Sequence, residues 1–177
     1  CTDRTITAAI TVQIDCDDND TLTVNSGVIL DYDNNDVVEA QDTDGVTIIN
    51  KVVVDTFNTI IENNFSVCRV NFRGVGKSDG EFDNGQGELA DAAAALDWLE
   101  RENFDNSQCW VSGFSFGSLI AMQLLMRRPE INRFIAISPQ PNVYDFSFLS
   151  PCPTSGLMVY GKKDELVPVE FINDLDK

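Results

Sequence analysis

The chain has 177 residues, 43% of them hydrophobic and 23% charged, and its formal net charge is −17. The length accommodates one ordinary domain with a sizeable core. The acidity excludes binding to nucleic acid and to anionic membrane surfaces, because both need clustered Lys and Arg. No run of 18 apolar residues is present, so we expect no membrane-spanning helix.

Residues 1–50 differ in composition from the rest of the chain. They hold ten Asp and one Glu against a single Arg, and apolar residues alternate with polar ones around Ile10 and Val12 and again around Leu22 and Val24. This period of two predicts short strands, and clusters of Asp, Asn and Gly predict the turns between them. We expect an acidic all-β segment here, unrelated to the remainder or solenoid-like, with a boundary near Asn50.

Residues 51–177 alternate between helical and extended patterns. In chain order these patterns predict a helix over 51–63, a strand over 66–72, a helix over 87–101, a strand over 108–112, a helix over 119–127, strands over 133–138 and 156–161, and a helix over 167–175. Such alternation indicates an α/β fold with a mostly parallel sheet and helices on both faces. Ligands of such sheets bind at the carboxyl ends of the strands.

A glycine-rich loop, residues 71–80, follows the first predicted strand of this part. It lacks the spacing of a phosphate-binding loop, and no helix begins directly at its glycines. We interpret it as a structural loop beside the later serine turn. Arg73 is the residue that could pair with a carboxylate and hold the loop in place.

The segment Gly113-Phe114-Ser115-Phe116-Gly117 is typical of a nucleophile elbow, because it stands between a predicted strand and a predicted helix. Such a turn lifts the serine hydroxyl above the sheet edge and points the backbone N–H of the next residue, Phe116, toward a forming oxyanion. The alternative interpretation is a glycine-rich turn that contains a serine by chance.

Asp164 follows the strand predicted over 156–161 and lies C-terminal to Ser115, which fits the chain order of serine, acid and base in such enzymes. Alternatively, it is an acid near a helix N-terminus, stabilised by the helix dipole. The chain contains no histidine, so the usual base is missing and the Ser115 hydroxyl would be a poor nucleophile at neutral pH.

Cofactor and metal sites are not expected. Without histidine, the common zinc and haem sites are excluded, and the Asp-rich residues 15–20 do not follow the EF-hand spacing, so a solvated turn is favoured there. The five cysteines form no C-x-x-C pair, which favours free thiols and a cytoplasmic location for the part after residue 50. An extracellular or cell-surface location remains open if residues 1–50 are a genuine part of the protein.

Residues 51–177 resemble the α/β-hydrolase superfamily, in particular its small bacterial dienelactone-hydrolase-like branch. The resemblance is carried by several segments, which are Asn71-Phe72-Arg73-Gly74, Gly80-Glu81-Phe82-Asp83, Gly87-Glu88, Ala95-Leu96-Asp97-Trp98, the elbow segment, Met122-Gln123-Leu124-Leu125 and Ser138-Pro139-Gln140-Pro141-Asn142. It implies a serine hydrolase that acts on a small-molecule ester, thioester or lactone through an acyl-enzyme on Ser115. Phe116 N–H would then be one oxyanion donor and Asp164 the acid of the triad.

The sequence also departs from this family. Residues 40–49 do not match the family's loop that supplies a second oxyanion donor, and the family's N-terminal strands and C-terminal histidine segment are missing. We therefore expect an incomplete α/β-hydrolase fold with impaired activity, preceded by the all-β segment. The alternative is an inactive hydrolase-like domain or chimeric fragment with a binding or assembly role. Missing strands would leave exposed sheet edges, through which the chain could self-associate.

Overall fold

The computed structural model describes residues 7–13, 21–23, 29–31, 51–63, 65–75, 78–103, 108–162, 164 and 166–175. In chain order the elements are β1 (Thr7–Gln13), β2 (Thr21–Thr23), β3 (Ile29–Asp31), α1 (Lys51–Glu62), β4 (Phe65–Asn71), α2 (Gln86–Glu102), β5 (Cys109–Phe114), α3 (Phe116–Leu125), β6 (Ile131–Ile137), the 3₁₀ turn η1 (Ser147–Leu149), β7 (Leu157–Val159) and α4 (Val169–Leu175). Each helix and strand predicted after residue 50 is present, with ends shifted by a few residues. The turn η1 was not predicted.

One sheet runs through the described residues, with strand order β2-β3-β4-β1-β5-β6-β7. Strands β4, β1, β5, β6 and β7 are parallel to one another, whereas β3 pairs antiparallel with both β2 and β4. The predicted mostly parallel sheet is thus confirmed. Helical connections suit this arrangement, because successive parallel strands cannot be joined by a tight hairpin.

Strand β1 lies in the middle of this sheet, between β4 and β5. Its pairing with β4 extends from Thr7 opposite Phe65 to Gln13 opposite Asn71. The described strands of the first 50 residues therefore share a sheet with the rest. The predicted boundary near residue 50 falls outside the described residues and stays a prediction.

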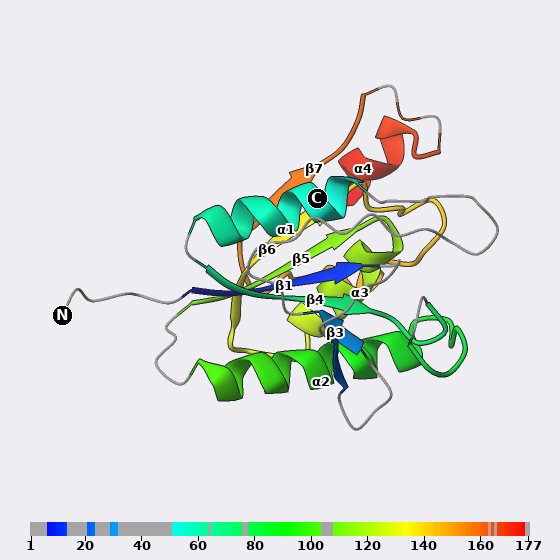
Figure 1. Cartoon of the computed structure of the whole chain (residues 1–177). Coiled ribbons are helices and arrows are strands. Elements are labelled where there is room, and N and C mark those ends of the chain that lie inside the picture. Colours follow the sequence, from blue (N-terminus) through cyan, green and yellow to red (C-terminus); the bar gives the residue numbers. More distant parts are fainter. Residues whose placement is uncertain are drawn as a thin grey trace.

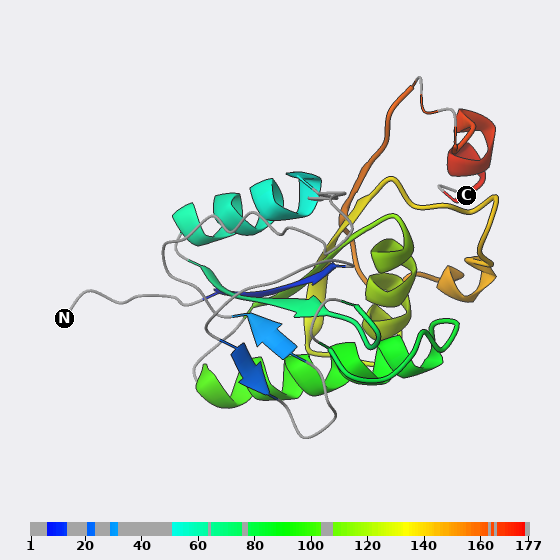
Figure 2. The same ribbon diagram turned by 45° about the vertical axis from the view of Figure 1, so that its right-hand side comes forward.

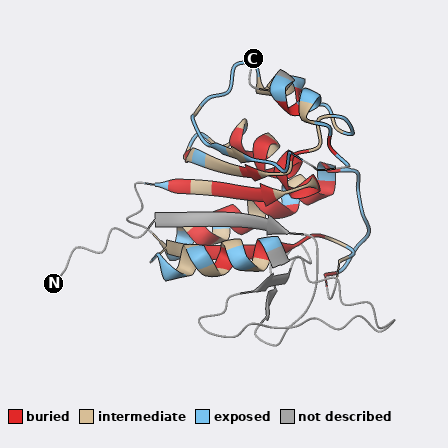
Figure 3. Cartoon of the chain, turned by 90° about the horizontal axis from the view of Figure 1, so that it is seen from above, coloured by how far each residue is buried: buried red, intermediate tan, exposed pale blue. Residues whose placement is uncertain are grey.

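Helices cover both faces of the sheet. Figure 1 and Figure 2 show α1 on one face and α2 with α3 on the other. Helix α1 buries Phe57 against Val67 of β4, forming a small cluster of its own. Among the residues whose burial is described, the buried ones gather on strands such as β4 and β5 and on the helix surfaces that meet them (Figure 3).

Helix α3 is the most deeply buried helix that the structure describes. Nine of its ten residues are buried, and Ile120 and Met122 have almost no exposed surface. A helix that is apolar on nearly every side is stable only inside a core. The start of α3, directly after Ser115, is therefore fixed by the packing of the whole domain.

Within the described parts of the chain, no helix has both the length and the apolar character needed to cross a membrane.

Candidate active site

Ser115 stands in a sharp turn between the end of β5 and the first residue of α3. Its backbone has φ of +53° and ψ of −118°, a region that residues other than glycine rarely adopt and that costs about 1–3 kcal/mol. The surrounding structure holds it there. The Ser115 N–H donates to the carbonyl of Ile137 at 2.9 Å, and the Ser115 carbonyl accepts from Ser118 N–H at 3.0 Å.

Gly113 is required by a close approach within this turn. A Cβ at Gly113 would lie 2.1 Å from the carbonyl oxygen of Gly117 and 2.4 Å from its carbonyl carbon. The buried Ser118 hydroxyl lies within hydrogen-bond distance of the carbonyls of Gly113 (2.8 Å) and Ile137 (3.0 Å). The strand–turn–helix geometry predicted for residues 113–117 is therefore present. The role of Ser115 as a nucleophile stays a prediction.

Phe116 is the first residue of α3, where a backbone N–H has no acceptor within the helix and lies at the positive end of the helix dipole. Its side chain is buried and contacts three other rings. The ring centroids of Phe72, Phe82 and Tyr144 lie 5.9, 5.5 and 5.6 Å from that of Phe116. The Phe72 and Phe82 rings meet Phe116 edge-to-face and the Tyr144 ring is tilted against it. Edge-to-face arrangements at these separations are favourable.

Asp164 lies in the loop between β7 and α4 and is half-buried. Its Oδ1 atom accepts hydrogen bonds from the N–H groups of Leu166 (2.9 Å) and Val167 (3.2 Å). The side-chain amide of Asn142 donates to the carbonyl of Leu166 at 2.9 Å and so ties this loop to the one after β6. Asp164 thus holds the turn that precedes α4. Its role as a catalytic acid and the alternative, an acid stabilised by the helix dipole, both stay predictions.

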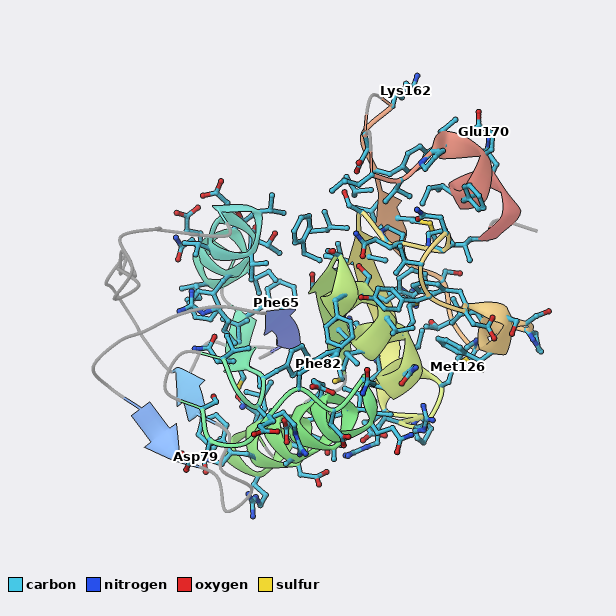
Figure 4. The ribbon with its side chains drawn as sticks, turned by 90° about the vertical axis from the view of Figure 1, so that its right-hand side faces the viewer. Phe65, Asp79, Phe82, Met126, Lys162 and Glu170 are labelled. Carbon is cyan, nitrogen blue, oxygen red and sulfur yellow. The ribbon has the colours of Figure 1, made fainter. Side chains whose placement is uncertain are left out.

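Ser115 and Asp164 both follow the carboxyl ends of strands in the same sheet. Backbone hydrogen bonds join these strand ends in a row, from Ser115 N–H to Ile137 in β6 and from Ser138 N–H to Val159 in β7 at 2.7 Å. The fold therefore brings both candidates to one edge of the sheet, with β6 between them. Figure 4 looks onto this edge, with Lys162 of the acid-bearing loop at the top and Phe82 near the middle.

The predicted pairing of Arg73 is confirmed. Its Nε and Nη2 atoms donate to the two carboxylate oxygens of Asp91 at 2.9 and 2.7 Å. This hydrogen-bonded pairing raises the pKa of the Arg73 guanidinium. Asp91 is fully buried in α2, so the pair joins the loop after β4 to that helix.

Glu88 also holds the loop between β4 and α2, and the sequence alone did not predict this role. Its fully buried carboxylate accepts the N–H groups of Asp83 and Gly85, each at 2.8 Å. Together with the Arg73 pair, this clamp fixes the chain between β4 and α2. The signal was the position of Glu88 three residues after Gly85, where a helix-capping glutamate is expected.

A cavity of about 790 Å³ with a mixed polar and apolar lining opens on the α3 side of β6 and β7, beside α4. Its lining includes Met122, Phe134, Tyr144, Met158 and Phe171, but neither Ser115 nor Asp164. Tyr144 is shared between this cavity and the ring cluster around Phe116. In the described residues, no group of three or more His, Cys, Asp or Glu side chains is arranged to hold a metal ion.

A family model for the alpha/beta hydrolase fold matches residues 56–162. The chain belongs to this family. The match spans β4 to β7 and includes the turn at Ser115, so the predicted α/β-hydrolase family and fold are confirmed. The dienelactone-hydrolase-like branch and the all-β character of residues 1–50 stay predictions.

Solved structures of this family agree. The Agrobacterium tumefaciens protein ATU1826, a protein of unknown function with a suggested alpha/beta-hydrolase assignment, has 40% sequence identity and a TM-score of 0.76, over 99% of this chain and 68% of its own. A Xanthomonas campestris protein, XC6422, described as an a/b serine hydrolase without lid, has 30% identity and a TM-score of 0.70, over 88% of this chain and 75% of its own.

An uncharacterized protein of Rickettsia prowazekii, RP471, is 53% identical over 129 residues, which are 71% of this chain and 54% of the Rickettsia protein. The chain thus spans about half the length of this curated relative.

Proposed function

We propose that the chain carries a serine-hydrolase site for ester, thioester or lactone bonds, with Ser115 as the nucleophile. The observation that supports this most strongly is the positive φ of Ser115. The turn needs glycine at position 113, because a Cβ there would overlap Gly117, and it leads directly into a buried helix. In hydrolases of this fold, such a turn presents the serine hydroxyl at the top of the sheet. The 30% identity with the Xanthomonas serine hydrolase is further support.

The proposed chemistry has two covalent steps. The Ser115 oxygen bonds to the substrate carbonyl carbon, the carbonyl electrons move to oxygen, and the serine proton passes to solvent. When the carbonyl re-forms, the bond to the alcohol, thiol or lactone oxygen breaks, and that group leaves with a proton. Water then attacks the acyl-enzyme, releasing the acid and restoring the Ser115 hydroxyl.

The Phe116 N–H is our proposed donor to the oxyanion, assisted by the positive end of the α3 dipole. Asp164 is the proposed acid of the site. Since the 177 residues contain no histidine, proton transfer from Ser115 depends on solvent. We expect turnover only in the residual range of about 10³–10⁴ over the uncatalysed rate, as in a triad enzyme that has lost its histidine.

Labelling with a fluorophosphonate probe tests this function, because a nucleophilic serine attacks the phosphorus atom of the probe and the adduct is stable. Without a histidine the reaction at Ser115 should be slow, so labelling is followed over a long incubation. We expect the purified chain to be modified at Ser115, located by mass spectrometry, and Ser115→Ala to be unmodified. Ser138→Ala is the matched control, since Ser138 also has a positive φ (44°) and follows the neighbouring strand. An adduct at Ser138, or none in a folded sample, would rule out the proposed nucleophile.

A second candidate is a hydrolase-like domain that acts in binding or assembly. The exposed edge of the sheet favours it, because Leu157 and Val159 of the terminal strand β7 are 55% and 43% exposed. Edge strands with exposed apolar residues pair readily with other chains. Light scattering should then show association that rises with concentration and is reduced in Val159→Lys; a monomer at all concentrations would refute this role.

A further inference from the structure

Phe82 is an exposed aromatic side chain beside the turn at Ser115. It is 59% exposed, and its ring contacts the ring of Phe116 edge-on, with 5.5 Å between centroids and 63° between planes. Phe116 is the residue after Ser115, so their Cα atoms lie about 3.8 Å apart. Phe82 therefore presents an open aromatic surface one ring contact away from the residue that follows the proposed nucleophile.

The backbone around Phe82 is held from both sides although its ring is exposed. On the C-terminal side, Glu88 accepts the N–H of Asp83, the neighbour of Phe82, at 2.8 Å. On the other side, Gly74 packs so closely that a Cβ there would lie 3.2 Å from the Cα of Glu81 and 3.4 Å from the nitrogen of Phe82. A loop whose backbone is held before a ligand arrives loses little conformational entropy on binding, which favours recognition.

Tyr144 contacts the Phe116 ring as well, at 5.6 Å. It comes from the loop after β6, whereas Phe82 comes from the loop after β4. These strands lie on opposite sides of β5 in the sheet. The ring of Phe116, the residue after Ser115, is thus contacted by aromatic side chains from two separate loops.

We infer that Phe82 forms an aromatic wall on the side of the turn at Ser115 and selects esters that carry a planar aromatic group next to the scissile bond. The inference rests on the proposed function of Ser115 and names the substrate class of that site. An aromatic ring of the substrate gains a ring–ring contact with Phe82 beyond the burial of apolar surface. An aliphatic group of similar size gains only the burial.

The test uses two unreactive ester analogues, N-phenylacetamide and N-butylacetamide, titrated into the 177-residue chain and followed by NMR chemical shifts. We expect the aromatic amide to bind more tightly, with Phe82→Leu weakening its binding by roughly threefold to tenfold while N-butylacetamide is unaffected. Leucine keeps the apolar bulk at a site that is largely exposed, so the variant should fold normally.

Phe171→Leu is the matched control. Phe171 is also an exposed aromatic (46%), but it lines the cavity beside α4. We expect it to change neither binding constant. Equal effects of Phe82→Leu on both amides, no effect, or a loss of aromatic binding in Phe171→Leu would each overturn the inference.

The same titration on Ser115→Ala separates this inference from the proposed function, because the amides bind without a covalent bond. A Phe82-dependent preference in both backgrounds supports the aromatic wall, even where fluorophosphonate labelling fails and the hydrolase function is lost. Labelling of Ser115 without that preference would support the hydrolase function but would overturn the inference about Phe82.

Discussion

The turn that carries Ser115 and the loop that carries Asp164 lie at the same edge of the sheet but are held in different ways. The serine turn is fixed by buried backbone, with Gly113 packed on Gly117 and with Ser118 fully buried. The Asp164 loop is largely exposed, with Leu166 74% accessible, and is held by a few polar contacts. Such contacts contribute about 0.5–1.5 kcal/mol each, so the position of the serine should survive changes that displace the acid.

Gly113→Ala is the substitution that should disturb the rigid turn at Ser115 most. The added Cβ would overlap backbone atoms of Gly117 that cannot move without shifting α3. We expect a loss of about 3 kcal/mol or more in the free energy of unfolding, measured by urea denaturation.

Gly161→Ala is the control on the acid side. There the nearest atom to an added Cβ, the Cβ of Asp164, lies at an ordinary 3.7 Å. We expect a change within about 0.5 kcal/mol. Similar losses in both variants would mean that the two turns are equally constrained.

The ion pair that holds the loop carrying Phe82 should contribute nearly as much to the free energy of unfolding. Arg73→Met would leave the buried carboxylate of Asp91 without its guanidinium partner. Breaking a buried ion pair in this way costs about 3 kcal/mol. Arg101→Met, at an exposed position of α2, should cost less than about 0.5 kcal/mol. Equal values from the two urea curves would show that the Arg73 pair does not hold the loop.

The buried thiol of Cys109, at the start of β5, should make a smaller, pH-dependent contribution to the free energy of unfolding. Burial, with the nearby charges of Glu100 and Glu130, raises the pKa of the Cys109 thiol from 9.0 to about 12. Above pH 9 the unfolded chain loses this proton while the folded chain keeps it. The contribution of the neutral thiol to the free energy of unfolding is therefore fully present below pH 9. It is lost as the pH rises toward 12, by about 1.4 kcal/mol per pH unit.

Urea unfolding at pH 8 and pH 10 measures this effect. We expect the wild-type chain to lose about 1 kcal/mol more between these two pH values than Cys109→Ala, which lacks the thiol. An identical loss in both proteins would contradict the buried, neutral thiol at the start of β5.

The smallest expected effect is on the acid-bearing loop. Asn142→Ala removes the hydrogen bond to the Leu166 carbonyl and should change the global stability by less than about 1 kcal/mol. It should nevertheless raise the amide exchange rates of Leu166 and Val167 by roughly fivefold, because local opening is governed by local contacts. Asn173→Ala, an exposed change in α4, should leave these rates unchanged; if it raises them equally, Asn142 does not hold the loop.

Much of the fold after residue 50 could be predicted from the sequence, because its signals are local. Helical and extended periodicities located the elements, and the two glycines around Ser115 specified the turn. The carboxyl-end position of Ser115 followed from the parallel sheet. Arg73 was expected to meet a carboxylate, although the sequence did not identify Asp91 as its partner.

The features that the sequence did not predict depend on distant contacts. Strand β1 lies between β4 and β5, and no local pattern specifies which strands become neighbours. Glu88 becomes a buried acceptor only when the loop folds back over α2. The ring cluster around Phe116 joins the start of α3 to residues from two separate loops, so the contact of Phe82 with Phe116 could not be inferred from its place in the chain.

The most direct test of the account is a crystal structure of the chain after reaction with a fluorophosphonate. We predict a bond from phosphorus to the Ser115 oxygen, with the phosphonyl oxygen about 2.7–3.1 Å from the Phe116 nitrogen. Such a structure would establish the nucleophile and one oxyanion donor together. An adduct on another residue, or a phosphonyl oxygen turned away from the start of α3, would contradict the central claim that this turn presents a working nucleophile.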